Sequence, residues 1–161
     1  MRIRFISHAS VVIQTDDVAI WTDPWRLGKV FNDSWTLFPP ADFDEALLEE
    51  IDYIWISHEH PDHCNVQTLR SLPDWFKDRV TILYQQRLSG RLFTALRAFG
   101  YRNFHPLPHR KVELLKGQTQ VYCYSVQLID SALAVADLEH AVVNVNDADF
   151  GAGECRAVLK D

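Results

Sequence analysis

The sequence predicts a mixed α/β fold, and three observations support this prediction. Short runs of β-branched and aromatic residues, separated by turn-like residues, occupy both ends of the chain. Segments with the apolar spacing of helices alternate with strand-like runs in the middle of the chain. An apolar run, residues 53–57, leads directly into the cluster HEHPDH at residues 58–63. The expected order is strands, then three helices that alternate with strands, then strands again.

The first part of the chain is predicted to form strands at residues 2–7, 10–15 and 18–22. Residues 23–40 contain proline, glycine and asparagine and are expected to form a long loop. Residues 42–51 open with acidic residues and continue with Leu47, Leu48 and Ile51, which favours a short helix.

The second part begins with a helix over residues 65–72, capped by Asn65. A strand follows at residues 79–84. The next helix, residues 87–100, has one apolar face and ends at Gly100. That face carries Leu88, Leu92, Phe93, Leu96 and Phe99. The last strands are expected at residues 111–115, 119–126, 131–136 and 140–146. The sequence contains no internal repeat or linker.

Composition is typical of a globular protein with one domain over residues 1–161, with 47% hydrophobic and 24% charged residues. The formal net charge is −6 and no basic run is present, so nothing favours nucleic acid or an anionic membrane as a partner. No apolar run approaches the roughly 20 residues that span a bilayer. The three cysteines form no CxxC pair, which favours a reducing, cytoplasmic location.

The histidine cluster has the residue types and spacing of a metal site. His58 and His60 are two residues apart at the end of a strand, so both can face one side. Asp62 and His63 follow a proline, where the chain turns toward the next helix. The four side chains can therefore converge on one cation, and such ligands suit Zn²⁺, Fe²⁺ or Mn²⁺. The alternative is a solvated loop that happens to be rich in histidine.

The segment SHEHPDH resembles the H-x-H-x-D-H signature of the metallo-β-lactamase superfamily. This resemblance implies a four-layer αββα sandwich with metals at one edge. Asp23, at the end of a strand in TDPW, resembles the aspartate of the family's first motif. Within the superfamily, the chain is most similar to the UlaG-like sugar-lactone hydrolases and to the metal domain of CMP-N-acetylneuraminate hydroxylase.

The resemblance also implies a ligand set. His58 and His60 would hold a first metal, Asp62 and His63 a second, and Asp147 would bridge the two. Asp149 is close enough in the sequence to be the bridging residue in place of Asp147. Asp147 could instead cap a turn.

The chain departs from the family pattern at one further ligand. The family supplies another histidine from a strand between the cluster and the bridging aspartate. Here the corresponding neighbourhood holds Gln127 and Asp130, of which Asp130 is the better ligand. His105 and His109 are interpreted as loop histidines outside the site.

The superfamily usually continues well beyond the point at which this chain ends. We therefore expect the N-terminal half of the sandwich plus the start of its second sheet, in a domain that is incomplete at its C-terminus. An open sheet face would favour a homodimer or a chain that supplies the missing half.

Other residues near these motifs have two readings each. His8 either lines the site or is a partly buried histidine with its own partner. Trp21, Trp25 and Trp35 form either an apolar wall for a substrate or part of the core. Cys64 lacks the partners of a catalytic nucleophile.

The leading function is a metal-dependent hydrolase acting on a small ester, lactone or phosphodiester-type substrate. One or two ions, Zn²⁺ or alternatively Mn²⁺ or Fe²⁺, would activate a water, and Asp62 would accept or orient its proton. One alternative is a di-iron oxygenase, although the sequence lacks the C-x-H…C-x-x-H pattern of a Rieske centre. Another is a non-catalytic half-domain that assembles with a partner.

Overall fold

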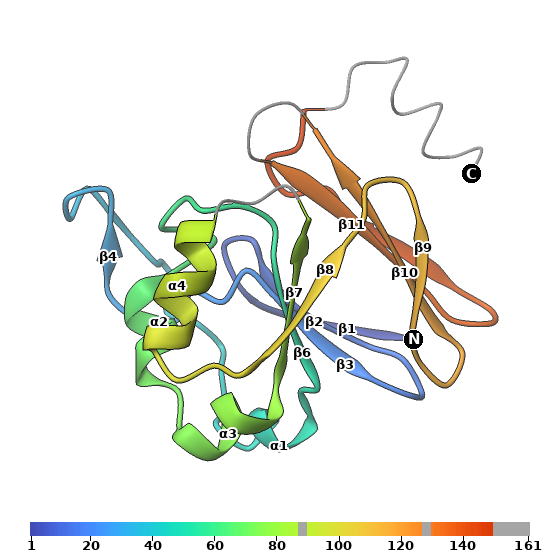
Figure 1. The fold of residues 1–161 in the computed structure, drawn as a ribbon. Coiled ribbons are helices and arrows are strands. Elements are labelled where there is room, and N and C mark those ends of the chain that lie inside the picture. The colour runs from blue at the N-terminus through green and yellow to red at the C-terminus, as the bar shows by residue number, and fades with distance from the viewer. Residues whose placement is uncertain (87–89, 127–129, 150–161) are drawn as a thin grey trace.

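The structure is a computed structural model that describes residues 1–86, 90–126 and 130–149. Two β-sheets pack against each other, and the helices lie on the outer side of the first sheet (Figure 1). The predicted mixed α/β class is therefore confirmed. None of the helices in these ranges is long and apolar enough to cross a membrane.

The first sheet has six strands in the order β1-β2-β3-β6-β7-β8. Their bounds are Arg2–Ser7, Ser10–Gln14, Ala19–Thr22, Tyr53–Ile56, Thr81–Gln85 and Asn103–Leu107. The pairs β1–β2 and β2–β3 are antiparallel, whereas β3, β6, β7 and β8 run parallel to one another. The carboxyl ends of these parallel strands therefore meet at one edge, where Asp23 and Ser57 follow β3 and β6.

The helices lie in the connections between the parallel strands. They are α1 (Leu47–Glu50), α2 (Val66–Ser71), α3 (Asp74–Arg79) and α4 (Gly90–Ala98). The predicted cap of α2 is present, because the Asn65 side chain accepts a hydrogen bond of 2.8 Å from the Thr68 backbone N–H. Leu69 and Phe76 are fully buried against the first sheet.

The second sheet has four antiparallel strands in the order β12-β11-β10-β9. Their bounds are Ala141–Asn144, Ser131–Ala136, Thr119–Ser125 and Val112–Lys116. Alternate residues of β11, such as Leu133 and Val135, are fully buried between the two sheets. From the first sheet, Ile20, Trp55 and Leu83 complete this core. Within the ranges described, no helix lies on the outer face of the second sheet (Figure 1).

Three segments differ from the prediction. Residues 103–107, expected to be a loop, form β8, because Leu107 is buried in the core between the sheets. Pro106 is tolerated there because β8 is an edge strand. Residues 74–79 form α3, which was not predicted. The long loop after β3 contains a small hairpin of β4 (Lys29–Val30) and β5 (Trp35–Thr36).

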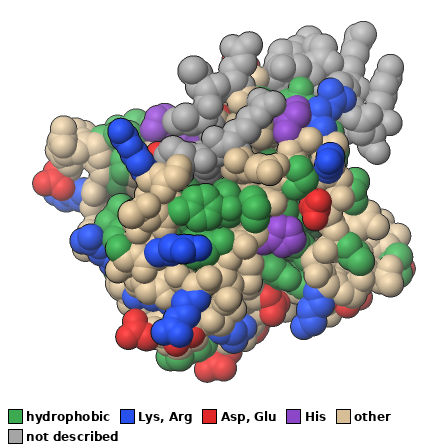
Figure 2. Space-filling view, in the orientation of Figure 1, with side chains coloured by type: hydrophobic (Ala, Val, Ile, Leu, Met, Phe, Trp, Pro, Cys, Tyr) green, Lys and Arg blue, Asp and Glu red, His purple; other side chains and the backbone are tan. Residues whose placement is uncertain are grey.

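Charged side chains are mixed over the face of the molecule that Figure 2 shows. Lysine and arginine side chains there are scattered among acidic and apolar ones and do not gather into one patch.

Candidate metal centre

The histidine cluster occupies the loop that joins β6 to α2. The backbone N–H groups of His63 and Cys64 both donate to the His60 carbonyl, at 3.0 and 2.7 Å. This tight turn carries Asp62 and His63 back toward the end of β6. His58, Asp62 and His63 are all buried, whereas His60 is exposed.

Asp23 anchors the cluster from the end of the neighbouring strand. Its carboxylate is fully buried and accepts hydrogen bonds from the Ser57 backbone N–H and the Ser57 hydroxyl, both at 2.8 Å. The third partner, His63 Nδ1, lies 2.9 Å from Asp23 Oδ2. A carboxylate can only accept, so His63 Nδ1 carries the proton in this contact. The lone pair of neutral His63 is therefore on Nε2, which faces the centre of the cluster.

The charges around His63 determine its protonation. Burial alone would lower the pKa of His63, but the hydrogen bond and charge of Asp23 act in the opposite direction. With the charges of Asp62 and Asp147 added, the pKa lies above its ordinary value. For His58, burial and the nearby His63 lower the pKa.

His58 is oriented by the residue before it. Its Nδ1 lies 3.0 Å from Ser57 Oγ. Because the Ser57 hydroxyl donates to Asp23, its oxygen accepts from His58 Nδ1. His58 Nε2 then faces His60 Nδ1 at 2.9 Å and Asp147 Oδ2 at 3.8 Å. Ser57 was not singled out from the sequence, and its only signal was its position directly before the cluster.

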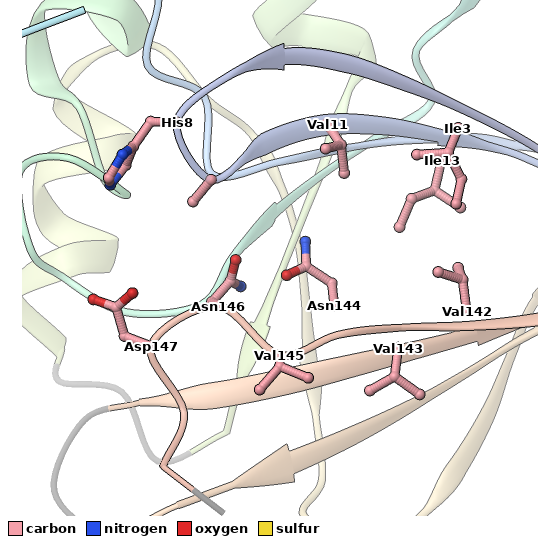
Figure 3. Close-up of a pocket in the computed structure, with 11 residues that line it drawn as sticks. Ile3, His8, Val11, Ile13, Val142, Val143, Asn144, Val145, Asn146 and Asp147 are labelled. Carbon is pink, nitrogen blue, oxygen red and sulfur yellow. The ribbon is translucent and has the colours of Figure 1, made fainter.

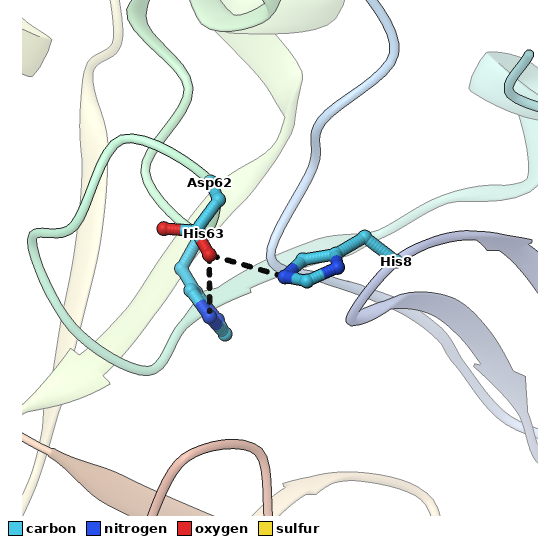
Figure 4. A group of neighbouring side chains, drawn as sticks. All are labelled: His8, Asp62 and His63. Carbon is cyan, nitrogen blue, oxygen red and sulfur yellow. Dashed lines mark hydrogen bonds and ion pairs between the residues drawn. The ribbon is translucent and has the colours of Figure 1, made fainter. Parts of the chain in front are cut away.

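The carboxylates of Asp62 and Asp147 both approach the Nε2 atom of His63. Asp147 Oδ2 is 3.3 Å from His63 Nε2, and Asp62 Oδ2 is 3.5 Å from the same atom. Asp62 Oδ2 also lies 3.0 Å from His8 Nε2 (Figure 4). His8 comes from the turn between β1 and β2, so the site draws on distant segments of the chain.

These residues form two groups that could hold a metal ion: His8, Asp62 and His63, and His58, His63 and Asp147. In each group the ligand atoms lie within 4.8 Å of one another. Two buried atoms at the centre, His63 Nε2 and Asp62 Oδ1, have no hydrogen-bond partner in the structure. Buried polar atoms are rarely left unpaired, and imidazole and carboxylate donors suit Zn²⁺, Mn²⁺ or Fe²⁺. The residues present therefore fit a divalent cation.

The remaining candidate residues are placed differently. Asp130 Oδ1 lies 3.4 Å from His58 Nδ1, on the opposite side of the ring from Asp147. His105 faces Glu113 at 3.6 Å, and His109 Nδ1 accepts from the Ser125 N–H, so neither belongs to the two groups. Asp149 is exposed and belongs to neither group.

Gln127 lies outside the described residues. Trp21 and Trp25 are buried in the core, whereas Trp35 is 51% exposed. Burial raises the pKa of the Cys64 thiol to about 12, which agrees with the absence of a nucleophilic role.

Comparison with known proteins identifies the family. Residues 2–153 match the family model of the beta-lactamase superfamily domain. A Mycobacterium tuberculosis protein named as a Rieske 2Fe-2S iron-sulfur protein is 31% identical over 158 residues, which cover 92% of this chain and 30% of that protein. Cytidine monophosphate-N-acetylneuraminic acid hydroxylase of Asterias rubens is 40% identical over 74 residues, 45% of this chain and 11% of the hydroxylase. The chain thus spans less than a third of the length of these relatives.

Two solved structures share the fold. A possible metal-dependent hydrolase from Veillonella parvula has a TM-score of 0.74 at 14% identity, covering 98% of this chain and 67% of its own. The diiron β-hydroxylase CmlA from Streptomyces venezuelae has a TM-score of 0.72 at 20% identity, covering 98% of this chain and 32% of its own. The family model matches nearly the whole chain, and both solved structures share its fold. The chain therefore belongs to the beta-lactamase superfamily and has its metallo-β-lactamase fold.

Proposed function

We propose that this chain is the metal-binding domain of a hydrolase that acts on a small ester, lactone or phosphodiester-type substrate. The observation that carries the proposal is the arrangement at His63. Asp23 fixes the proton of its ring on Nδ1, and the buried Nε2 has no hydrogen-bond partner and lies close to two carboxylates. A carboxylate behind a histidine is the usual support of a metal-binding imidazole.

In this proposal His58, His60, Asp62, His63 and Asp147 hold one or two ions. His63 belongs to both candidate groups, but its Nε2 offers a single lone pair, so it can serve one ion at a time. A second ion would therefore depend on His58, His60 and Asp147. Zn²⁺ is the first choice for this mixture of imidazole and carboxylate, with Mn²⁺ and Fe²⁺ as alternatives. Asp130 supports His58 from its Nδ1 side.

The bound cation would lower the pKa of a water and polarise the electrophilic carbonyl or phosphoryl group of the substrate. Asp62 would be the catalytic residue that orients this water and takes up its proton. Its Oδ1 is buried without a partner, while its Oδ2 is held by His8 at 3.0 Å. One carboxylate oxygen is thus fixed and the other is available to the water.

The first test is elemental analysis of protein purified without chelator or added metal. The variant His60→Ala removes an exposed ligand, and His140→Ala removes an exposed histidine on the turn between β11 and β12. We expect bound zinc or manganese in the wild type and in His140→Ala, and less in His60→Ala. Equal metal in both variants would place the site elsewhere.

The second test is a screen of lactones, esters and phosphodiesters with the metal-loaded protein. Asp62→Asn should lose most of the hydrolysis while it retains the fold, as measured by circular dichroism. An Asp62→Asn variant as active as the wild type would remove Asp62 from the proposed mechanism.

A second candidate is a di-iron oxygenase domain. Carboxylate oxygens from Asp62, Asp130 and Asp147 all lie within 4 Å of a site histidine, and such oxygen-rich sets also suit iron. A hydroxylase is among the relatives. Iron in the purified protein, with oxygen consumption in the presence of a reductant, would favour this reading over hydrolysis.

The chain also presents apolar side chains on the outer side of the second sheet. Val112 and Leu114 of β9 are each 59% exposed, and Val143 of β12 is 40% exposed. We propose that a second copy or another chain covers this face. Size-exclusion chromatography with light scattering would test this, and a monomer at high concentration would argue against the second copy.

A further inference from the structure

Two clefts open beside His8. The first, with a volume of about 550 Å³, lies between the β1–β2 hairpin and β12. Figure 3 shows His8 and Asp147 at one end of this cleft and apolar side chains such as Ile3, Ile13 and Val142 at the other. The second cleft, of about 530 Å³, lies between β1 and residues 34–40. A substrate at the candidate metal centre would therefore have room on both sides of His8.

The charges of the two clefts disfavour an anionic substrate. Among the described residues that line them, none is lysine or arginine. The acidic residues are Asp147 in the first cleft and Asp42 in the second. In the first cleft a phosphate or sulfate group would meet the Asp147 carboxylate with no basic side chain among the described lining residues, which is unfavourable in a partly desolvated cleft. In the second cleft Asp42 pairs with Arg4 at 3.6 Å, so this cleft carries little net charge. Both clefts suit an uncharged molecule.

The second cleft has aromatic walls that water can reach. Phe5 is 60% exposed, Trp35 51% and Phe38 95%. Large aromatic side chains that stay exposed in one groove are typical of a binding surface.

The same aromatic segment contacts the candidate metal centre. The Trp35 ring lies edge-to-face to His8 with 6.2 Å between centroids, and Phe31 lies 5.0 Å from Trp35. Phe31 is in turn 6.4 Å from the His60 ring. The cleft therefore borders His8, and the aromatic segment beside it also reaches His60 through Phe31.

The backbone of the β4–β5 turn supports a functional role for this segment. Phe31, Asn32 and Asp33 have φ values of 52°, 54° and 65°. Asparagine and aspartate adopt the left-handed region readily, but it is costly for a bulky residue such as Phe31. Such strain occurs most often where a site requires a particular geometry. Here the turn holds Phe31 and Trp35 beside the histidines.

We infer that the substrate is an uncharged carboxylic ester or lactone with an aromatic ring, and that the ring binds in the cleft lined by Phe5, Trp35 and Phe38. This inference rests on the proposed hydrolase function and narrows its substrate class. In the reaction, the oxygen of water bonds to the carbonyl carbon and the bond from that carbon to the alkoxy oxygen breaks. An ester gives a carboxylate, an alcohol and one released proton, and a lactone gives the carboxylate and the hydroxyl group on one molecule with the same released proton.

Binding of a neutral probe tests the inference independently of turnover. N-benzylacetamide carries a ring and an amide in place of the ester, and phenyl phosphate carries the same ring with an anionic group. Dissociation constants would be measured by titration calorimetry for the wild type, Trp35→Ala and Trp75→Ala. Trp75 is the matched control, because it is 47% exposed on α3 and lines neither cleft.

We expect N-benzylacetamide to bind the wild type and Trp75→Ala with the same affinity. It should bind Trp35→Ala about 2- to 10-fold more weakly, because the loss of one ring–ring contact changes the affinity by about that factor. Phe38→Ala gives a second variant whose exposed side chain contributes little to folding, and it should weaken binding in the same direction. Equal affinities of Trp35→Ala, Phe38→Ala and Trp75→Ala would overturn the inference. Tighter binding of phenyl phosphate than of N-benzylacetamide to metal-free protein would also overturn it.

Metal content measured on the same samples separates the two proposals. Bound metal without binding of the ring refutes the inference and leaves the hydrolase proposal standing. Ring binding that depends on Trp35 in a protein unable to bind metal supports the aromatic cleft and refutes the hydrolase.

Discussion

Replacing Asp23 by asparagine tests whether a single proton position controls metal binding. Asparagine has nearly the same shape as aspartate and can keep the hydrogen bond from the Ser57 backbone N–H to Oδ1. The other oxygen becomes an amide NH₂ group, which donates. That group would face the Ser57 hydroxyl at 2.8 Å and His63 Nδ1 at 2.9 Å, both of which donate in the wild type.

The expected response is a change of tautomer at His63. To accept from the new NH₂ group, Nδ1 must lose its proton, and the proton then resides on Nε2. The lone pair that faces Asp62 and Asp147 is lost in this tautomer. Loss of such a supporting partner typically weakens metal binding 10- to 100-fold, or about 1.4–2.8 kcal/mol.

The fold should weaken as well. Two hydrogen bonds to a charged acceptor, at about 1.5–3 kcal/mol each, are replaced by poorer contacts, and relaxation recovers part of the loss. We expect the free energy of unfolding of metal-free protein to fall by about 2–4 kcal/mol.

Metal affinity would be measured by competition with a chromogenic chelator at a temperature where circular dichroism shows both proteins folded. Asp52→Asn is the matched control, because Asp52 accepts a hydrogen bond of 3.0 Å from the Ala19 N–H at the opposite end of β6. An Asp23→Asn variant that holds the ion as tightly as Asp52→Asn would refute the proposed role of the His63 tautomer.

Three further predictions concern the fold. Asn65→Ala removes the cap of α2 and should lower the free energy of unfolding by about 1 kcal/mol in urea titrations; an unchanged midpoint would contradict the observed cap. Cys123 is fully buried with its pKa raised to about 12 by burial, so peptide mapping should find it unmodified by iodoacetamide at neutral pH until the protein is unfolded. The N–H groups of Glu139 and His140 hold the pKa of Asp137 below its ordinary value of 3.8. The ionised carboxylate therefore stabilises the fold at pH values above 3.8. This stabilisation is lost as the pH falls through the folded-state pKa. Asp137→Asn should therefore lower the Tm at pH 7 and have little effect at pH 2, whereas an equal deficit at both would exclude the ionised carboxylate as the cause.

The sequence predicts those parts of the molecule whose signals are local. The strand Tyr53–Ile56 is a continuous apolar run, as expected for a central parallel strand, and Asn65 is a direct helix-start signal. The spacing of the histidine cluster likewise indicates that its side chains lie close together. These features depend on a few neighbouring residues and need no knowledge of tertiary packing.

Other features depend on how distant segments meet. The sequence of β8 suggests a loop because a short edge strand of five residues contains His105 and Pro106, and burial of Leu107 makes it part of the sheet. The place of His8 beside Asp62 depends on the turn between β1 and β2, which no motif encodes. Asp130 was a candidate ligand by chemistry, but its approach to the Nδ1 side of His58 depends on where β11 begins. The cytoplasmic location inferred from the cysteines stays a prediction.

The site joins the two layers of the fold. His58 and His63 follow a strand of the first sheet, whereas Asp147 follows β12, the edge strand of the second. An ion shared by these residues would act as a reversible cross-link between the layers, formed only when both are in place. Ligand binding to the folded state alone adds about 2.7 kcal/mol of stability when the free ion is at 100 times its dissociation constant. The resistance of the sandwich to unfolding would then follow the concentration of free cation around it.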